Sequence, residues 1–381
     1  MANKPKLCIS TIDFGSGGTE RVISTLLPEL VNDFEVTLVL YYNQIHYPIH
    51  KDVKLVILIP DRKGSTSTFS KLKDFVVLLF KYKSYVKHNH IDISLTLLPE
   101  PNIINSVIAM TNKKVKTIIS ERCYPSITYS KLSLKIAEIV FPFFYNKNYK
   151  LFSNSVHINE DLRDNFGVTL PMSVIYNPVE MDFGHTKSNS EIASTPFKII
   201  NVGSMVWRKN QKLIIDALHL LDKNDYHLTY LGVGHLLNDL KQQALQYELE
   251  NNITYKGSVK NVKDYLVESD CFVLSSTTEG FPNVLIEALS VGLPSISTNC
   301  LSGPLELLND NEPITIENGG FYLAKYGILI NVDDYEGLAN AIKYFKEHPE
   351  ERKRYSQLGL QRAKDFDLKT IYAQVKELLI N

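Results

Sequence analysis

The chain has 381 residues, of which 44% are apolar and 22% are charged, and its formal net charge is −1. This composition is typical of a soluble globular protein, and the length predicts two domains of nearly equal size. No start resembling a signal peptide and no apolar run of about 20 residues is present, so we expect a protein that is neither secreted nor integral to a membrane. The four cysteines are scattered without metal-ligand or redox spacing, and we expect them to be reduced thiols.

Apolar strands alternate with helical segments in the first half, which predicts a parallel sheet covered on both faces. The expected strands are 7–12, 36–41, 53–58, 91–96, 117–120 and 150–153. After the first strand, Gly15, Gly17 and Gly18 would let the backbone approach a ligand closely. The pattern is not the dinucleotide fingerprint, because its third glycine would fall at Glu20. A tight turn without a ligand is the alternative.

A basic helix is expected within 65–90, where five lysines intersperse with apolar residues and face a single aspartate. Such a helix can lie on an anionic membrane surface, and the alternative is a solvated lysine face over an ordinary core stripe. Residues 1–180 carry 21 Lys and Arg against 16 Asp and Glu, whereas residues 181–381 carry 20 against 26. A nucleic-acid partner is not expected, because no basic and aromatic cluster extends beyond this helix.

A domain boundary is predicted near residues 177–178, followed by a polar tract over 184–195 that is typical of a linker. We therefore expect an N-terminal domain over 1–177, a C-terminal domain over 178–366, and a final helix over 367–381 that packs back on the first domain. The alternation of strands and helices continues through the second half. Its expected strands are 198–202, 227–231, 253–255, 271–274 and 294–297.

The first strand of the second half leads into a turn at Gly203 and then a helix, with Arg208 and Lys209 expected at the start of that helix. Their charges oppose the helix dipole there and stabilise nothing locally. This placement suggests an anionic ligand such as a diphosphate, with two solvated surface cations as the alternative.

The segment Thr278–Glu287 places two carboxylates, Glu279 and Glu287, eight positions apart across a junction between strand and helix. Pro282 suits the first helical position, and the amides around it could bind an anion. Glu287 lies among apolar helix residues, so its carboxylate needs partners. Sugar or ribose hydroxyls could serve, and a backbone cap or a core arginine is the alternative. We interpret the junction as a site for a phosphorylated sugar.

Together these segments resemble the retaining glycosyltransferases of family 4. Glu279 and Glu287 match the E-x7-E motif of that family, Gly203 with Lys209 resembles its glycine and lysine region, and Gly15–Arg21 resembles its N-terminal glycine loop. The resemblance covers nearly the whole chain. It implies an α/β protein of GT-B fold, with two Rossmann-like, doubly wound parallel-sheet domains facing a central cleft.

The resemblance also implies roles for individual residues on the donor side. Glu287 would bind the donor ribose, Glu279 would contact the transferred sugar, and Arg208 and Lys209 would neutralise the diphosphate. Other donor contacts are implied for Gly17, Gly18, Gly203, Val259, Gly280, Phe281, Pro282, Asn283 and Val284.

Two positions depart from the family pattern. The family often has an arginine directly after the glycine at position 203, where this chain has Ser204, and Arg208 would compensate. It also often has an acceptor-side histidine after the fifth strand, where this chain has Glu121 and Arg122, either of which would serve instead.

The expected chemistry is front-face attack with retention, in which the cations stabilise the diphosphate as its charge grows. A double displacement with Glu279 as the nucleophile is the less favoured route, because the resemblance places that residue beside the sugar hydroxyls. Neither a cofactor nor a metal is expected, because the only D-x-D sequence, Asp365–Asp367, lies away from every motif.

Residues 15–28 are similar to bacterial enzymes that extend polyprenyl-diphosphate-linked oligosaccharides with N-acetylgalactosamine or related sugars. The similarity implies a UDP-linked hexose or N-acetylhexosamine donor, a lipid-linked glycan acceptor, and a cytoplasmic protein held peripherally on the inner face of the plasma membrane. The product would enter surface polysaccharides or glycoprotein glycans. The alternatives are a UDP-sugar 2-epimerase of the same fold and a non-catalytic module that binds sugar nucleotides or membranes.

Overall fold

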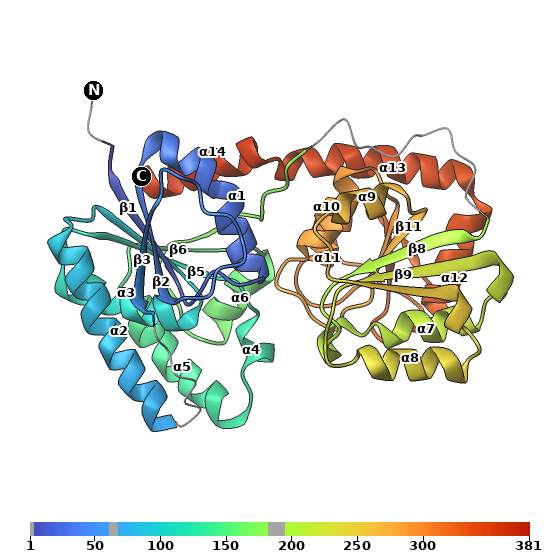
Figure 1. The fold of residues 1–381 in the computed structure, drawn as a ribbon, viewed down its shortest axis with the longest axis horizontal. Coiled ribbons are helices and arrows are strands. Elements are labelled where there is room, and N and C mark those ends of the chain that lie inside the picture. The colour runs from blue at the N-terminus through green and yellow to red at the C-terminus, as the bar shows by residue number, and fades with distance from the viewer. Residues whose placement is uncertain (1–3, 61–67, 182–194) are drawn as a thin grey trace. The chain divides into compact units, whose positions relative to one another are not determined.

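The protein is described by a computed structural model over residues 4–60, 68–181 and 195–381. These residues form two compact units, of which the first comprises Met1–Pro178 with Leu368–Asn381 and the second Val179–Asp367 (Figure 1). Most of the expected linker, at 184–194, and the first part of the expected basic helix, at 65–67, lie outside the described residues.

The first unit is built on a seven-stranded sheet of order β3-β2-β1-β4-β5-β6-β7, in which all neighbouring strands are parallel. The strands are β1 (Lys6–Thr11), β2 (Glu35–Tyr42), β3 (Lys54–Ile59), β4 (Ile93–Leu97), β5 (Lys116–Glu121), β6 (Lys150–Ser153) and β7 (Met172–Val174). The helices are α1 (Gly18–Asp33), α2 (Thr68–His88), α3 (Pro99–Thr111), α4 (Pro125–Thr128), α5 (Lys131–Tyr145), α6 (Val156–Asp164) and α14 (Leu368–Ile380). This is the strand order of a doubly wound sheet, and it reverses between β1 and β4.

Alternate residues of β1 show how helices come to cover both faces of this sheet. Leu7 and Ile9 join a buried cluster with Val22 and other residues of α1, whereas Cys8 between them joins a cluster with Tyr82 of α2. Successive side chains of a strand point to opposite faces, so a continuous apolar run gives a core on each side.

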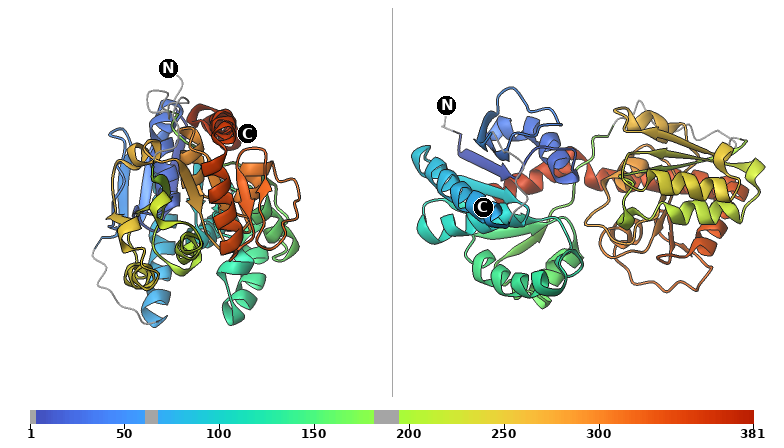
Figure 2. Two further views of the ribbon diagram at one scale, coloured as in Figure 1. Left: turned by 90° about the vertical axis from the view of Figure 1, so that its right-hand side faces the viewer. Right: turned by 60° about the horizontal axis from the view of Figure 1, so that its bottom comes forward.

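The C-terminal helix α14 belongs to the first unit and packs on α1 (Figures 1 and 2). Ile371 and Val375 enter the buried cluster that contains α1. At the last residue of α1, Asp33 accepts hydrogen bonds from Lys376 at 2.7 Å and from Tyr372 at 2.5 Å. These two hydrogen bonds lower the pKa of Asp33.

The second unit repeats the architecture with a sheet of order β10-β9-β8-β11-β12-β14-β13, in which only β13 is antiparallel to its neighbour. Its strands are β8 (Phe197–Val202), β9 (Tyr226–Leu231), β10 (Ile253–Gly257), β11 (Cys271–Leu274), β12 (Ser295–Thr298), β13 (Tyr322–Leu323) and β14 (Ile328–Ile330). Its α-helices are α7 (Lys212–His219), α8 (Leu237–Gln246), α9 (Val262–Val267), α10 (Asn283–Ser290), α11 (Pro304–Asn309), α12 (Tyr335–Glu347) and α13 (Pro349–Ala363). Its 3₁₀ turns are η1 (Trp207–Lys209), η2 (Lys223–Asp225), η3 (Glu250–Asn252) and η4 (Lys364–Phe366).

Three strands, β7, β13 and β14, were not among those expected from the sequence. Each has two or three residues, which is too short for an apolar pattern to show its period. Within the described part of the chain, no helix combines the length and apolar character needed to cross a bilayer.

Candidate active site

Two loops of the second unit meet at the carboxyl ends of β8 and β11, the neighbouring strands at which the strand order reverses. Doubly wound sheets bind their ligands at this edge, at the point of reversal. The loop after β8 carries Arg208 and Lys209, and the loop after β11 carries Glu279. The sheet topology therefore brings together side chains that are 70 positions apart in the sequence.

Glu279 is the buried centre of this site, with 6% of its surface exposed. Its Oε1 accepts hydrogen bonds from Lys209 Nζ at 2.5 Å and from Ser276 Oγ at 2.6 Å, and Arg208 Nη1 lies 3.5 Å from its Oε2. Burial alone raises the pKa of Glu279, but Lys209, Ser276 and Arg208 more than offset it and hold that pKa below its ordinary value. The carboxylate is therefore charged at neutral pH.

The two cations lie in the 3₁₀ turn η1, and the expectation that they stand at the start of the following α-helix is wrong. Helix α7 begins at Lys212, and Asn210 in between adopts a left-handed conformation with φ of 46°. The sequence pattern did not separate these possibilities, because a short 3₁₀ turn and the first turn of an α-helix place side chains at similar spacing. The cations are thus positioned by η1 and its contacts instead of by the first turn of α7.

Hydrogen bonds fasten η1 to the loop after β11. The amide of Thr277 donates to the carbonyl of Arg208 at 2.8 Å, and Ser275 Oγ donates to the carbonyl of Lys209 at 2.8 Å. The Lys209 side chain is 13% exposed, whereas that of Arg208 is 55% exposed. Lys209 is therefore held in place before any ligand arrives, while Arg208 can turn toward one.

The loop between Glu279 and α10 is supported by a glycine that could not be replaced without strain. Gly303 has φ of 99°, and a Cβ there would lie 2.5 Å from Cδ of Pro282. Beside it, Ser302 Oγ donates to the carbonyl of Gly280 at 2.6 Å. Pro282 precedes α10, which begins at Asn283, so the proline is the N-cap and not the first helical residue as expected. Helix ends are commonly placed one residue differently by sequence and by structure.

The other donor-side residues predicted in the second unit also follow the carboxyl ends of strands. Gly203 comes directly after β8, and Val259 lies two residues after β10. Phe281 is buried, while Asn283, Val284 and Glu287 of α10 are half-buried. This edge of the sheet thus holds all the donor-side residues that were predicted from the second half of the sequence.

The predicted glycine loop of the first unit is closed by an acidic side chain. Helix α1 begins at Gly18, and a Cβ added to Gly17 would collide with the carboxylate of Glu20. Burial raises the pKa of Glu20, and Asp13 accepts a hydrogen bond from the amide of Gly15 at 2.9 Å. In the sequence, Glu20 showed only that the loop lacks the third glycine of the dinucleotide fingerprint. No sequence signal indicated that its carboxylate would lie against Gly17.

Glu121 and Arg122, predicted on the acceptor side, are both buried at the end of β5. The Glu121 carboxylate accepts hydrogen bonds from the Arg122 amide at 3.1 Å and from the Tyr145 hydroxyl at 3.0 Å, and the Arg122 guanidinium donates to Asn177 at 2.8 Å. Burial raises the pKa of Glu121 to about 7 and lowers that of Arg122 to about 10. The two side chains hold the end of this strand together with neighbouring segments of the first unit.

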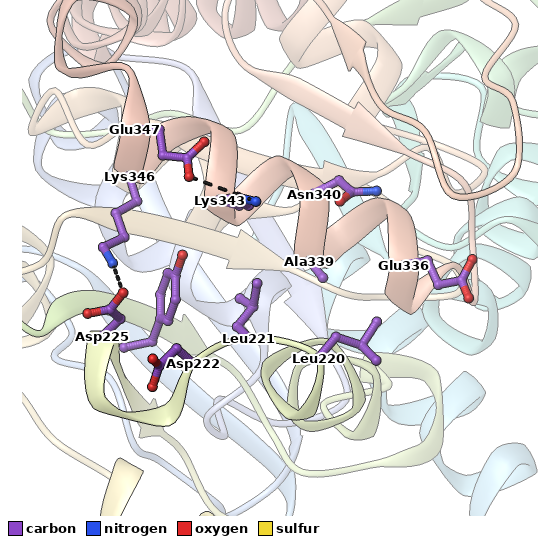
Figure 3. A pocket seen from close by; sticks show the side chains of 11 residues that line it. Leu220, Leu221, Asp222, Asp225, Glu336, Ala339, Asn340, Lys343, Lys346 and Glu347 are labelled. Carbon is purple, nitrogen blue, oxygen red and sulfur yellow. Dashed lines mark hydrogen bonds and ion pairs between the residues drawn. The ribbon is translucent and has the colours of Figure 1, made fainter.

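A separate depression of about 450 Å³ lies elsewhere in the second unit, between η2 and α12 (Figure 3). Asp225 and Lys346 form an ion pair at its edge, and Lys343 pairs with Glu347 at 3.9 Å. None of the predicted site residues lines it.

Comparison with known proteins agrees with this geometry. Residues 182–362 match the family model described as glycosyl transferases group 1. Over 365 residues the chain is 31% identical to N-acetylgalactosamine-N,N'-diacetylbacillosaminyl-diphospho-undecaprenol 4-alpha-N-acetylgalactosaminyltransferase of Campylobacter jejuni, covering 95% of this chain and 96% of that protein. The chain belongs to the group 1 glycosyltransferases.

Other relatives extend this result. This glycosyltransferase is 24% identical to a second Campylobacter jejuni protein, GalNAc-alpha-(1->4)-GalNAc-alpha-(1->3)-diNAcBac-PP-undecaprenol alpha-1,4-N-acetyl-D-galactosaminyltransferase, covering 99% of this chain and 98% of that one. Anabaena HepE, whose crystal structure contains UDP and glucose, has a TM-score of 0.76 at 17% identity, with 98% and 99% of the two chains covered. The GT-B fold expected from the sequence is confirmed. The epimerase and the non-catalytic module receive no support from these relatives.

Proposed function

We propose that this glycosyltransferase is a retaining enzyme that moves a hexose or N-acetylhexosamine from a UDP-sugar to a polyprenyl-diphosphate-linked glycan. The observation that carries the proposal is the contact of 2.5 Å between Lys209 and Glu279 where the second sheet reverses its strand order. Cations beside a buried carboxylate suit a ligand that has both a diphosphate and sugar hydroxyls.

In the proposed complex, Lys209 and Arg208 bind the diphosphate, and Glu279 accepts a hydrogen bond from a hydroxyl of the transferred sugar. Glu287 binds the ribose hydroxyls. The backbone amides that flank Pro282, at residues 280, 281, 283 and 284, lie along the sugar and phosphates. The low pKa of Glu279 supports this role, because an ionised carboxylate is a hydrogen-bond acceptor only.

The proposed reaction breaks the bond between the anomeric carbon and the diphosphate oxygen and forms a bond from that carbon to the acceptor oxygen on the same face. The acceptor proton passes to the departing phosphate oxygen. Negative charge grows on the diphosphate as the bond breaks, so fixed cations at Lys209 and Arg208 stabilise the transition state more than the ground state. We propose that this chemistry requires no metal ion.

The names of the relatives support the choice of substrates. The two Campylobacter jejuni proteins are named for transferring N-acetylgalactosamine to sugars on diphospho-undecaprenol, and the HepE structure contains UDP. An N-acetylhexosamine donor linked to UDP and an undecaprenyl-type acceptor are therefore the first substrates to test.

An acceptor carried by a membrane lipid requires the enzyme to reach a membrane surface. We propose a cytoplasmic protein on the inner face of the plasma membrane, in contact with anionic lipid through residues 65–90. In the described part of this segment, Lys71, Lys73 and Lys87 are exposed, and Phe80 is 67% exposed. Lys81 Nζ instead donates a hydrogen bond to the carbonyl of Leu58 at 2.7 Å, so this ammonium group is held against the protein.

The proposed function is tested by incubating the enzyme with a panel of UDP- and GDP-sugars and an undecaprenyl-diphosphate-linked glycan, and by analysing the products by mass spectrometry and the linkage by NMR. We expect an acceptor enlarged by one α-linked sugar only with a UDP-sugar, and equal rates in EDTA and in Mg²⁺. An inverted linkage, free epimerised UDP-sugar, or transfer that depends on metal would each contradict a stated part of the proposal.

A further inference from the structure

Helix α5 of the first unit carries apolar side chains on two opposite faces. On one face Ala137, Phe141 and Tyr145 are buried in a cluster with neighbouring strands and helices. On the other face four large apolar side chains point outward, which we call the apolar stripe: Leu132 (72% exposed), Ile136 (52%), Ile139 (73%) and Phe143 (57%).

The spacing shows that the apolar stripe is a continuous surface. Its members are separated by four, three and four positions, so they lie on one side of the helix and extend about 17 Å along it. A helix that is apolar on both sides is buried, or lies at a membrane or partner surface.

The charges around the apolar stripe indicate what covers it. Lys131 and Lys135 are exposed at positions directly preceding two of its members, and Lys147 lies 5.8 Å from the ring of Phe143. From residue 131 to residue 150 the chain carries four lysines and one glutamate. Apolar side chains edged by lysines match the acyl boundary and the negative headgroups of an anionic bilayer.

A second copy of the chain fits this surface less well. Two copies would bring the same lysines together, and four side chains on one helix cover much less than the roughly 800 Å² per partner that a stable interface buries. Both α2, which was predicted as the membrane helix, and α5 reach the lower end of the first unit in Figure 1 and in the left view of Figure 2.

We propose that the apolar stripe of α5 inserts into the interfacial layer of an anionic lipid bilayer, with Lys131 and Lys135 at the level of the headgroups. The inference rests on the proposed function in that a lipid-linked acceptor gives the enzyme a reason to reside there. It adds the apolar stripe of α5 to the membrane contact proposed for α2, which contributes its exposed lysines and exposed apolar side chains such as Phe80.

The test is sedimentation of the full chain with vesicles of phosphatidylcholine containing 30% phosphatidylglycerol. The double variant Ile136→Gln/Ile139→Gln should lower the partition coefficient about ten-fold or more, because two inserted side chains become polar. The control Leu245→Gln/Ile380→Gln changes two apolar side chains that are 63% and 56% exposed on other helices, and it should bind as the wild type does. Unchanged circular dichroism and Tm establish that each variant is folded.

Charge is tested separately with Lys131→Gln/Lys135→Gln, which should weaken binding to anionic vesicles and flatten its dependence on salt. The proposal is overturned if the wild type does not sediment with anionic vesicles, or if the Ile136→Gln/Ile139→Gln variant sediments as well as the control. It is also overturned if light scattering shows a dimer that this variant dissociates without loss of vesicle binding.

Transfer to an acceptor with a short, water-soluble lipid chain keeps this inference separate from the proposed function. The stripe variants should transfer sugar to that acceptor at the wild-type rate, since none of the changed residues belongs to the candidate active site. Failure of the wild type with every acceptor would defeat the proposed function and leave the vesicle result standing.

Discussion

Replacing Lys209 with methionine removes one charge from the candidate site and leaves the length of the side chain almost unchanged. Glu279 would then be a buried carboxylate with two remaining partners, the Ser276 hydroxyl at 2.6 Å and the half-exposed Arg208 at 3.5 Å. Breaking a buried ion pair costs about 3–5 kcal/mol, and the remaining partners reduce this to about 2 kcal/mol. If the proposed chemistry is correct, kcat falls by about 10²–10³-fold, as it does when one group that stabilises transition-state charge is lost.

In Lys209→Met, the contribution of Glu279 to the stability of the fold should depend on pH in the opposite direction from the wild type. In the wild type the pKa of Glu279 is lowered, so its contribution to stability is present above the unfolded-state pKa and is lost as the pH falls through the folded-state pKa. Without Lys209, burial dominates and raises that pKa, so the ionised carboxylate destabilises the fold at neutral pH. The stability deficit of Lys209→Met should therefore shrink as the pH is lowered from 7.5 toward 5.

Chemical denaturation across this pH range and a UDP-release assay measure the two effects. Lys212→Met, at the exposed first residue of α7, is the matched control and should change neither. In the background of Glu279→Gln the cost of Lys209→Met should largely disappear, since the buried charge is gone. An equal cost in both backgrounds, or a wild-type rate in Lys209→Met, would refute the reasoning.

Three further predictions concern other parts of the structure. Gly303→Ala should lower the free energy of unfolding by about 1–3 kcal/mol through contact with Pro282, whereas Gly319→Ala, at a similar positive φ but with 3.3 Å to the nearest atom, should cost less in the same denaturation experiment. Arg208→Gln should lower kcat/KM about ten-fold with little change in Tm, since an ion pair of a half-exposed side chain adds little stability. Asp33→Asn should lower Tm at pH 7, and its difference from the wild type should shrink as the pH falls below the ordinary pKa of a carboxyl toward the lowered pKa of Asp33, as calorimetry at pH 7 and pH 3 would show.

The sequence predicted the architecture well, because parallel strands buried on both faces appear as apolar runs such as Cys271–Leu274. It also predicted that Glu279 and Lys209 lie at one site, although only the resemblance connected them. Nothing in the spacing of these residues reveals that β8 and β11 are neighbours, since the pairing of strands so far apart in the sequence depends on the whole sheet.

Other features could not be predicted, because they depend on contacts that are distant in the sequence. Ser276, which completes the partners of Glu279, belongs to a run of serine and threonine that is typical of any loop. The burial of Glu121 depends on Tyr145 of α5. The sequence also could not show which side of α5 is exposed. Apolar residues such as Ile139 and Phe141 are chemically alike, and only the fold decides which of them faces the core.

The pairing of Lys209 with Glu279 also bears on how binding energy is used in the proposed reaction. With no donor bound, the carboxylate balances the lysine, so neither charge is buried without a partner. A donor diphosphate bound as proposed would compete with Glu279 for the lysine, and this competition would weaken binding of the ground state. As the glycosyl bond breaks in the proposed reaction, the charge on the diphosphate grows and its attraction for Lys209 increases, whereas the charge of the carboxylate stays fixed. In the proposed reaction, the ion pair thus makes Lys209 stabilise the transition state more than the bound donor. Only such a difference in binding energy increases the rate of the chemical step.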